Sequence, residues 1–302
     1  MGSPFLTSNF ADLFHDVSNI IAIKIEVDKS DSTDHFSVTL VIYKPNFFLR
    51  FGIIYDFPNN INPHLIDSIL SKVINYCRIY HCWYLEIRNS KDNRIYNSNF
   101  DSFGFQYKPW LNALLHLHDN WENGISKSKR RNIQKGVKTG LYFKVCQNKM
   151  EVFEAYLLIC SQYRKIRKPL PDIKLFYNSF DNPKFSKVFN TYFGSNLVAT
   201  SLVLLNDFTA AQFIFAADKN NINYTQSASF HQWSLIEWSY KNGFTHIDLV
   251  GGGEKNKPYG VREFKRRFGA TFNEVGRWNL VFYPIRWNLI FVINNIISKK
   301  LI

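Results

Sequence analysis

The chain of 302 residues is 46% hydrophobic and 20% charged, which supplies a core for one large domain or two smaller ones and excludes a disordered tail. Lys and Arg outnumber Asp and Glu by 37 to 24, and the resulting net charge of +13 predicts an anionic partner. No apolar stretch approaches the roughly 20 residues that cross a bilayer. The first residues lack a secretory signal, and four cysteines are too few for a disulfide scaffold, so we expect a cytoplasmic protein.

The first half of the chain predicts one α/β unit. Pro45-Asn46 separates two segments rich in β-branched and aromatic residues, which is typical of a hairpin. Pro63 suits the first turn of a helix, and apolar residues recur after it at helical spacing. The expected elements are strands at 36–44, 47–55, 82–87 and 110–117 and a helix at 63–80.

A strongly basic segment follows, because residues 121–170 carry a net charge of +9. Ser126 can cap a helix at its start, with Ile133 and Val137 facing inward and an end near Gly136 or Gly140. One side of this helix is predicted to present Lys127, Arg130, Arg131, Gln134 and Lys138. Such a stripe either holds phosphates or is an ordinary solvated helix face.

The second half repeats the order of the first. Its expected elements are strands at 192–205, 208–216, 245–250 and 271–282 and a helix at 229–241. Glu86 and Asp248 take matching strand positions in the two halves, which implies two copies of one α/β unit. A further amphipathic helix is expected at 150–165, and a last one at 286–301 that packs on the body or lies on a membrane surface.

A second basic segment, residues 255–267 with a net charge of +5, follows three glycines. The glycines lie between a strand and a helix, where exposed backbone N–H groups can bind an anion. The segment matches neither a P-loop nor a dinucleotide fingerprint, so a flexible loop stays open as the alternative. Asp248 either caps this loop or contacts substrate. The candidate substrate-binding residues here are Asp248, Gly251, Gly252, Gly253, Tyr259 and Arg262.

In the order and spacing of these motifs, the sequence resembles the Fem family of peptidoglycan-bridge aminoacyltransferases and related acyltransferases with tandem acetyltransferase-type domains. The resemblance covers nearly the whole chain. It is densest in Ser126–Gly140, Trp233–Trp238, Asn242-Gly243, Ile247–Gly252 and Phe264–Gly269. It implies an α/β fold of two tandem GNAT-like (acyl-CoA N-acyltransferase) domains with mixed sheets. We place the N-terminal domain at 1–120 and the C-terminal domain at 121–302.

The resemblance also implies a reaction, in which an amine attacks the ester of an aminoacyl-tRNA or the thioester of an acyl-CoA in a channel between the domains. Lys265 matches the family's lysine in Phe-Lys-x-x-Phe, which neutralises charge near the donor. Asp56 falls where some members carry an acid that takes the amine proton, although Ile53 replaces the family's proline. Arg130 and Arg131 would touch phosphates of donor or acceptor. On chemical grounds alone, Lys265 or the amides of residues 251–253 are candidate stabilisers of the oxyanion intermediate.

The leading hypothesis is a Fem-like N-acyltransferase that moves an amino acid from aminoacyl-tRNA to an amine of a nucleotide- or lipid-linked cell-envelope precursor, peptidoglycan or surface glycan. The acetyl-CoA signature Gln/Arg-x-x-Gly-x-Gly/Ala is missing, which favours tRNA as donor. One alternative is an acyl-CoA-dependent enzyme acting on an amino sugar in surface polysaccharide synthesis. Another is a non-catalytic protein that binds RNA or an anionic membrane. We expect no cofactor besides the donor substrate and no metal, and peripheral membrane contact through the last helix.

Overall fold

The computed structural model describes residues 2–28, 35–220 and 224–287, and its contacts divide the chain into two compact units. Unit 1 comprises Trp110–Glu274 with two short N-terminal pieces, residues 1–4 and 12–18. Unit 2 comprises Asn19–Pro109, Phe5–Ala11 and the segment that starts at Val275. No helix in these described ranges is long and apolar enough to cross a membrane.

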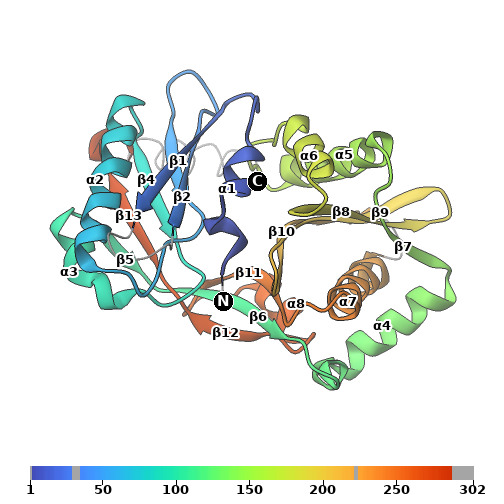
Figure 1. Cartoon of the computed structure of the whole chain (residues 1–302). Helices are drawn as coiled ribbons and strands as arrows, with labels where there is room; N and C mark the ends of the chain where they lie inside the picture. The colour runs from blue at the N-terminus through green and yellow to red at the C-terminus, as the bar shows by residue number, and fades with distance from the viewer. Residues whose placement is uncertain (1, 29–34, 221–223, 288–302) are drawn as a thin grey trace. The chain divides into compact units, whose positions relative to one another are not determined.

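Unit 2 is built on a six-stranded sheet in the order β1-β2-β3-β4-β13-β5. Its strands are β1 (Ile20–Asp28), β2 (His35–Tyr43), β3 (Phe51–Ile54), β4 (Tyr84–Arg88), β5 (Gln106–Lys108) and β13 (Arg277–Val281). Only β3 and β4 pair in parallel, so they need a crossover, which α2 (Pro63–Ile79) supplies. Asn62 caps α2 by accepting from the backbone N–H of His64 at 3.0 Å. The apolar side of α2 covers one face of the sheet (Figure 1).

Unit 1 is built on a seven-stranded sheet in the order β12-β6-β11-β10-β9-β8-β7. Its strands are β6 (Trp110–His116), β7 (Leu141–Val145), β8 (Ser186–Phe193), β9 (Asn196–Leu205), β10 (Thr209–Ala217), β11 (His246–Glu254) and β12 (Thr271–Glu274). Here the parallel pair is β10 and β11, joined through α7 (Tyr224–Lys241). α5 (Lys149–Lys165) and α6 (Ile173–Asp181) lie on the sheet face opposite α7, and α4 (Lys127–Lys138) packs on α7 (Figure 1).

The remaining helical segments are short. They are η1 (Pro4–Leu6), α1 (Ser8–Asp12), η2 (Arg94–Tyr96), α3 (Asn97–Ser102), η3 (Trp121–Gly124) and α8 (Gly260–Arg266). Each unit thus has antiparallel strands, a parallel pair with its crossover helix, and a short helix before the next strand. This is the duplicated α/β unit that the sequence predicts.

Each sheet contains one strand from the other half of the chain. β6 follows β5 in sequence but lies between β11 and β12, and β13 follows β12 but lies between β4 and β5. The inserted strand β13 is well anchored, because Trp278 is 1% exposed and stacks on Phe100 with ring centroids 4.4 Å apart. The two repeats therefore exchange their last strands.

This exchange explains why the compact units differ from the predicted domains 1–120 and 121–302. The chain passes between units at Pro109–Trp110 and again at Glu274–Val275. Sequence patterns record where one repeat ends and the next begins. They do not record long-range pairing, which decides the sheet to which a strand belongs.

Most predicted elements are confirmed, including the hairpin, α2, α4 with its Ser126 cap, and α5. The strand predicted at 192–205 is wrong, because it is β8 and β9 joined by a turn in which Gly194 has a φ of 58°. The strand predicted at 271–282 divides into β12 and β13, which lie in different sheets. The helix predicted at 286–301 falls almost entirely outside the described residues.

Candidate active site

The two parallel strands of unit 1 pair only briefly. Their register runs from Thr209 opposite His246 to Ala211 opposite Asp248, after which β10 pairs only with β9 and β11 only with β6. Both strands carry irregularities just beyond this point, and Val250 has a φ of 59°, which a β-branched residue rarely adopts. Beyond this point, residues 212–217 of β10 and 249–254 of β11 no longer pair with each other. Backbone groups there need other partners.

Lys265 supplies those partners from α8. Its Nζ donates to the carbonyls of Leu249 at 2.5 Å, Val250 at 3.1 Å and Gly251 at 2.8 Å. All three ammonium protons are therefore used on β11, directly beyond the point where the strands part. Burial lowers the pKa of Lys265 to about 8, and the nearby Asp248 carboxylate opposes this shift. The side chain is therefore largely charged at neutral pH, and its role near the donor stays a prediction.

The guanidinium of Arg262 likewise donates its hydrogen bonds to backbone carbonyls. Its side chain donates to the carbonyls of Gly252 at 2.7 Å, Lys255 at 3.2 Å and Glu254. Beside it, Gly253 has a φ of 81°, and a Cβ there would lie 2.8 Å from the ring of Tyr259. The sequence places the three glycines between a strand and a helix, but they lie within β11, where Gly251 and Gly253 pair with β6 and Gly252 stands at an irregularity. Arg262 and Tyr259 clamp this end of the strand, and their role toward substrate stays a prediction.

Two buried polar residues, Asp248 and Gln212, flank the point in the chain where β10 and β11 part. Asp248 is buried and accepts from Asn112 Nδ2 at 3.0 Å and from the backbone N–H of Val250 at 2.7 Å. Asp248 therefore caps the irregular turn of its own strand, which is one of the two roles predicted for it. Gln212, at the irregularity of β10, is 6% exposed, and its Nε2 has no hydrogen-bond partner among the described residues. An orphaned buried amide calls for a water or a ligand acceptor at this place.

Lys129 is a buried cation that the sequence reasoning missed. It is 6% exposed, donates to Ser229 Oγ at 3.1 Å, and lies over the rings of Phe264 at 4.1 Å and Phe268 at 5.5 Å. Burial, and next the charge of Arg267, lower the pKa of Lys129 to about 8. Phe264 and Phe268 of the Phe-Lys-x-x-Phe motif thus make cation–π contacts with Lys129. Lys265, which lies between them in the motif, donates hydrogen bonds to β11.

The inward face of α4 explains why Lys129 was missed. Lys129, Ile133 and Gly136 are its buried positions, and a Cβ on Gly136 would lie 2.9 Å from Leu141 Cδ1 and 3.1 Å from Phe230 Cβ. The glycine lets α4 approach α7 closely. Gly136 therefore lies on the side of α4 that contacts α7. The prediction that Val137 faces inward is wrong, since Val137 is 55% exposed. The spacing of residues 129, 133 and 136 is the signal that could have found Lys129.

Replacing Lys129 with methionine is expected to stabilise the protein at pH 7 by on the order of 1–3 kcal/mol. Its pKa falls from 10.5 to about 8 on folding, so the cost of burying its charge is fully present below pH 8 and fades as pH rises toward 10.5. Ser229 keeps its own bond to the carbonyl of Thr225 at 2.6 Å. The stability gain of Lys129→Met should therefore shrink between pH 8 and pH 10.5.

Chemical denaturation at pH 7 and near pH 10 measures this, with Lys138→Met on the exposed side of the same helix as the control. A loss of stability at pH 7 in Lys129→Met alone would mean that the ring and hydroxyl contacts outweigh desolvation.

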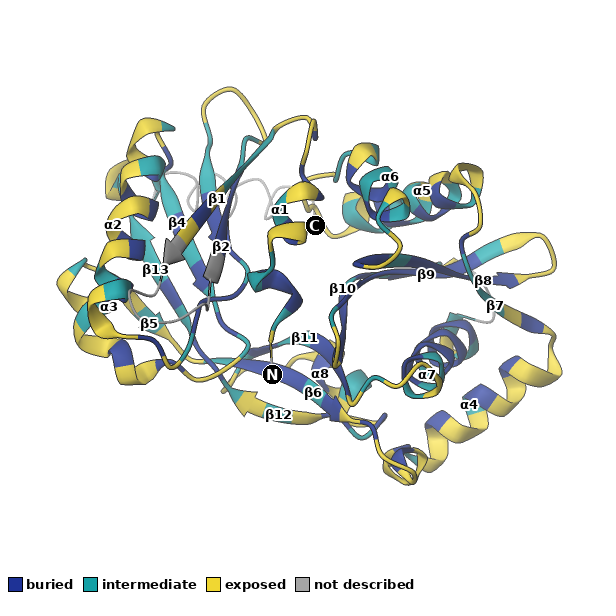
Figure 2. Cartoon of the chain, in the orientation of Figure 1, coloured by how far each residue is buried: buried dark blue, intermediate teal, exposed yellow. Residues whose placement is uncertain are grey.

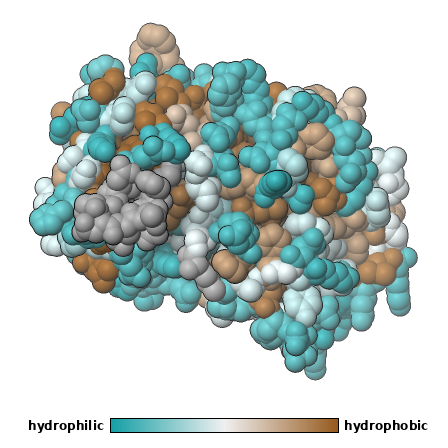
Figure 3. Space-filling model, viewed as in Figure 1, coloured by the Kyte–Doolittle hydropathy of each residue, from teal (hydrophilic) through white to brown (hydrophobic). Residues whose placement is uncertain are grey.

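Four basic side chains of α4 have no ionic partner. Lys127, Arg131, Lys135 and Lys138 are exposed, and none forms an ion pair or side-chain hydrogen bond with the chain as far as the structure describes it. Figure 2 shows α4 exposed along its outer side, and Figure 3 shows hydrophilic residues over the same region. Arg130 is different, because it donates to the carbonyls of Ile125 at 2.9 Å and Glu122 at 2.7 Å and so fixes the start of the helix.

Asp56 lies in unit 2, just beyond β3. It is 2% exposed and accepts from the backbone N–H groups of Phe57 at 3.0 Å and Ser90 at 2.8 Å and from Ser90 Oγ at 2.6 Å. Ser90 lies just beyond β4, so Asp56 ties together the ends of the parallel pair in this unit. The corresponding pair in unit 1 parts instead. The assignment of Asp56 as proton acceptor stays a prediction.

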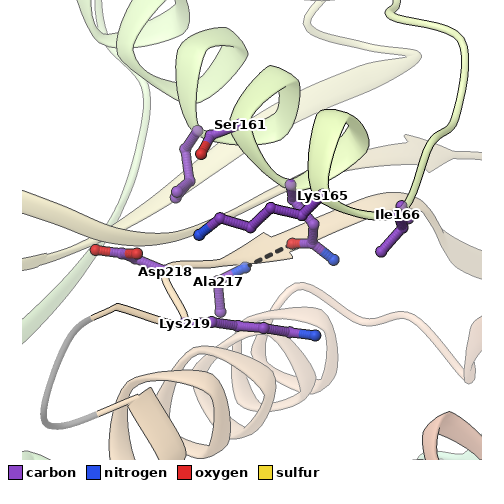
Figure 4. Close-up of a pocket in the computed structure, with 8 residues that line it drawn as sticks. Ser161, Lys165, Ile166, Ala217, Asp218 and Lys219 are labelled. Carbon is purple, nitrogen blue, oxygen red and sulfur yellow. Dashed lines mark hydrogen bonds between the residues drawn. The ribbon is translucent and has the colours of Figure 1, made fainter. Parts of the chain in front are cut away.

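A small recess lies elsewhere in unit 1, between the last turns of α5 and the end of β10 (Figure 4). Its volume is about 20 Å³, enough for only a few atoms. Lys165 and Lys219 extend across it in opposite directions, and Gln162 Oε1 accepts from the backbone N–H of Ala217 at 3.2 Å. Its size argues against a substrate site.

Neither a known family nor a curated protein sequence matches this chain, but solved structures do. FemX is 12% identical with a TM-score of 0.68 and covers 96% of this chain and 94% of its own. The C-terminal domain of a putative lysylphosphatidylglycerol synthetase from Agrobacterium fabrum is 11% identical with a TM-score of 0.58, covering 90% and 92%. A tandem GNAT protein from the clavulanic acid biosynthesis pathway is 10% identical with a TM-score of 0.54, covering 87% and 84%. The fold is tandem GNAT-like. FemX shares this fold over nearly the whole length of both chains.

Proposed function

We propose that this protein is an N-acyltransferase that moves an amino acid from aminoacyl-tRNA to an amine of a cell-envelope precursor. The observation that carries the proposal is the parting of β10 and β11 beside Lys265 and the orphaned amide of Gln212. Parted strands expose backbone donors and acceptors that a carbonyl-bearing donor can use. The similarity to FemX and to a lysylphosphatidylglycerol synthetase domain supports transfer of an acyl or aminoacyl group.

The proposed reaction needs no covalent enzyme intermediate. The amine nitrogen attacks the ester carbonyl carbon, a C–N bond forms, and the ester C–O bond breaks. The leaving ribose hydroxyl takes one proton, and Asp56 is proposed to accept the proton that the ammonium loses. Lys265 places positive charge next to the carbonyls of β11 and offsets the negative charge that develops on the donor.

The unpaired cations of α4 favour tRNA over acyl-CoA as the donor. Four exposed charges on one helix present a surface much longer than a CoA diphosphate needs, and they suit a polyanion. In this assignment Lys127 and Arg131 contact tRNA phosphates directly, and Arg130 positions the helix. Acyl-CoA remains the alternative donor, because the fold also occurs in a GCN5-related N-acetyltransferase, with a TM-score of 0.50.

Binding of charged tRNA should weaken steeply with salt. If the four unpaired cations of α4 contact phosphates, affinity should fall about 100-fold between 50 and 200 mM salt. Replacing Lys127, Arg131, Lys135 and Lys138 with glutamine should remove most of that dependence. Filter binding at several salt concentrations measures it, and the matched control replaces four lysines that are ion-paired on other elements, Lys144, Lys149, Lys241 and Lys255.

Equal loss in both variants would show general charge attraction only. Transfer assays with charged tRNA and with acyl-CoA, offered nucleotide-linked and lipid-linked amines, then decide the donor. Turnover with acyl-CoA alone would replace tRNA in the proposal, and binding of tRNA without turnover from any donor would favour a non-catalytic RNA-binding protein.

A further inference from the structure

The sheet of unit 2 has a polar face opposite α2. Leu85 and Ile87 of β4 point into the core under α2, so Tyr84, Glu86 and Arg88 alternate onto the other face. On the neighbouring strand β13, Arg277 pairs with Arg88 and Asn279 pairs with Glu86. Two arginines from adjacent strands therefore stand side by side on this face.

These two arginines share one carboxylate oxygen. Glu86 Oε1 accepts from Arg88 Nε at 2.6 Å and from Arg277 Nη1 at 3.0 Å. Tyr84 donates to Asn279 Oδ1 at 2.5 Å and lies 3.4 Å from Glu86 Oε2. The carboxylate of Glu86 therefore faces two guanidinium groups.

The terminal edge of Arg88 is the open part of the cluster. Its Nη1 and Nη2 form no hydrogen bond within the described ranges, and its side chain is 28% exposed. The guanidinium lies over the ring of Tyr55, 4.8 Å from the centroid, and the Tyr55 hydroxyl is 2.5 Å from that of Tyr43. The fork is therefore held in a fixed plane while two of its nitrogens remain available for bidentate binding.

The electrostatics of the cluster favour the binding of an anion. Burial, and next the charge of Arg88, lower the pKa of Arg277 to about 10. Burial would raise the pKa of Glu86, but the two guanidiniums outweigh it and lower that pKa. A second negative charge would relieve the repulsion between the arginines. Another arginine of this unit, Arg94, already has its carboxylate, since it binds both oxygens of Asp92.

We propose that the open edge of Arg88 binds the oxyanion of a small ligand, a carboxylate or a phosphate. This site belongs to unit 2 alone and does not depend on the transfer reaction. Lysine could not replace the arginine, because an ammonium lacks the planar fork that accepts two oxygens at once.

The test uses the whole protein labelled with ¹⁵N-arginine, in which the Nε–H signals are followed by NMR. Acetate and inorganic phosphate are titrated separately, at an ionic strength held constant with potassium chloride. The signals of Arg88 and Arg277 should shift saturably with at least one of the two anions, and the anion that saturates at lower concentration identifies the oxyanion. Arg88→Lys, which keeps the charge beside Glu86, should weaken binding at least tenfold.

Arg78→Lys is the matched control, because Arg78 is an exposed arginine of α2 in the same unit and forms no ion pair with any residue that the structure describes. It should bind as the unmodified protein does. Shifts that stay linear with both anions, or equal weakening in the Arg78 and Arg88 variants, would overturn the proposal.

Discussion

Replacing Lys265 with methionine is expected to lower the free energy of unfolding by about 3 kcal/mol or more and to abolish transfer. The change leaves three buried carbonyls, those of Leu249, Val250 and Gly251, without their donor. Lys129 and Lys265 both have a pKa near 8, yet we expect opposite signs for the two methionine variants. The reason is that one ammonium holds three strand carbonyls and the other holds a single hydroxyl.

Denaturant unfolding of Lys265→Met measures the first effect, with Lys257→Met as the control. Lys257 belongs to the same basic segment but is 69% exposed and forms a surface ion pair with Glu254, so its loss should change stability by less than about 0.5 kcal/mol. Lys265→Arg should recover part of the stability but little of the turnover, because a guanidinium cannot place three protons on the same three carbonyls. A Lys265→Met protein as stable as the unmodified one would show that these bonds are not structural.

A fragment of residues 1–109 is expected not to fold cooperatively, even though it contains five of the six strands of the unit 2 sheet. It lacks β13, so β4 loses one partner strand and β5 loses its only neighbour in the sheet. It also lacks Trp278, which fills the core against Phe100 and donates to Asn93 Oδ1 at 3.0 Å. Truncating a buried tryptophan to alanine alone costs about 3–5 kcal/mol, a large part of the stability of an ordinary domain.

The rescue experiment appends residues 275–287 to this fragment through a flexible linker. The extended fragment should show a sigmoidal unfolding transition by circular dichroism, and the same construction carrying Trp278→Ala should lose it. A cooperative transition in the fragment without β13 would mean that the first repeat does not need the exchanged strand.

Local features of the fold could be predicted from the sequence. Ser126 and Asn62 act as helix caps, and the apolar spacing of 63–80 is that of α2, because these signals depend on neighbours within one or two turns. The exchange of β6 and β13 could not be predicted. Either strand would satisfy its apolar pattern in either sheet, and the choice depends on partners far away in sequence.

The candidate site was predicted in part. The sequence singled out Lys265, Arg262 and Asp248, which lie on or beside β11 in the structure. It did not indicate that Lys265 and Arg262 donate their hydrogen bonds to backbone carbonyls. Gln212 carries a signal that went unused, since it is a lone amide in the apolar strand Ala210–Ala217. Arg88 and Arg277 were missed because they meet only across strands that are remote in sequence.

The exchanged strand has a consequence for synthesis on the ribosome. The partners of β13 are among the first segments made, but β13 itself emerges only after nearly all of unit 1. At ordinary translation rates the nascent N-terminal half waits roughly ten seconds or more for its missing strand. During that interval β4 and β5 present bare hydrogen-bonding edges, which are templates for wrong pairing and binding surfaces for chaperones. The half of the molecule that is translated first is the half that matures last.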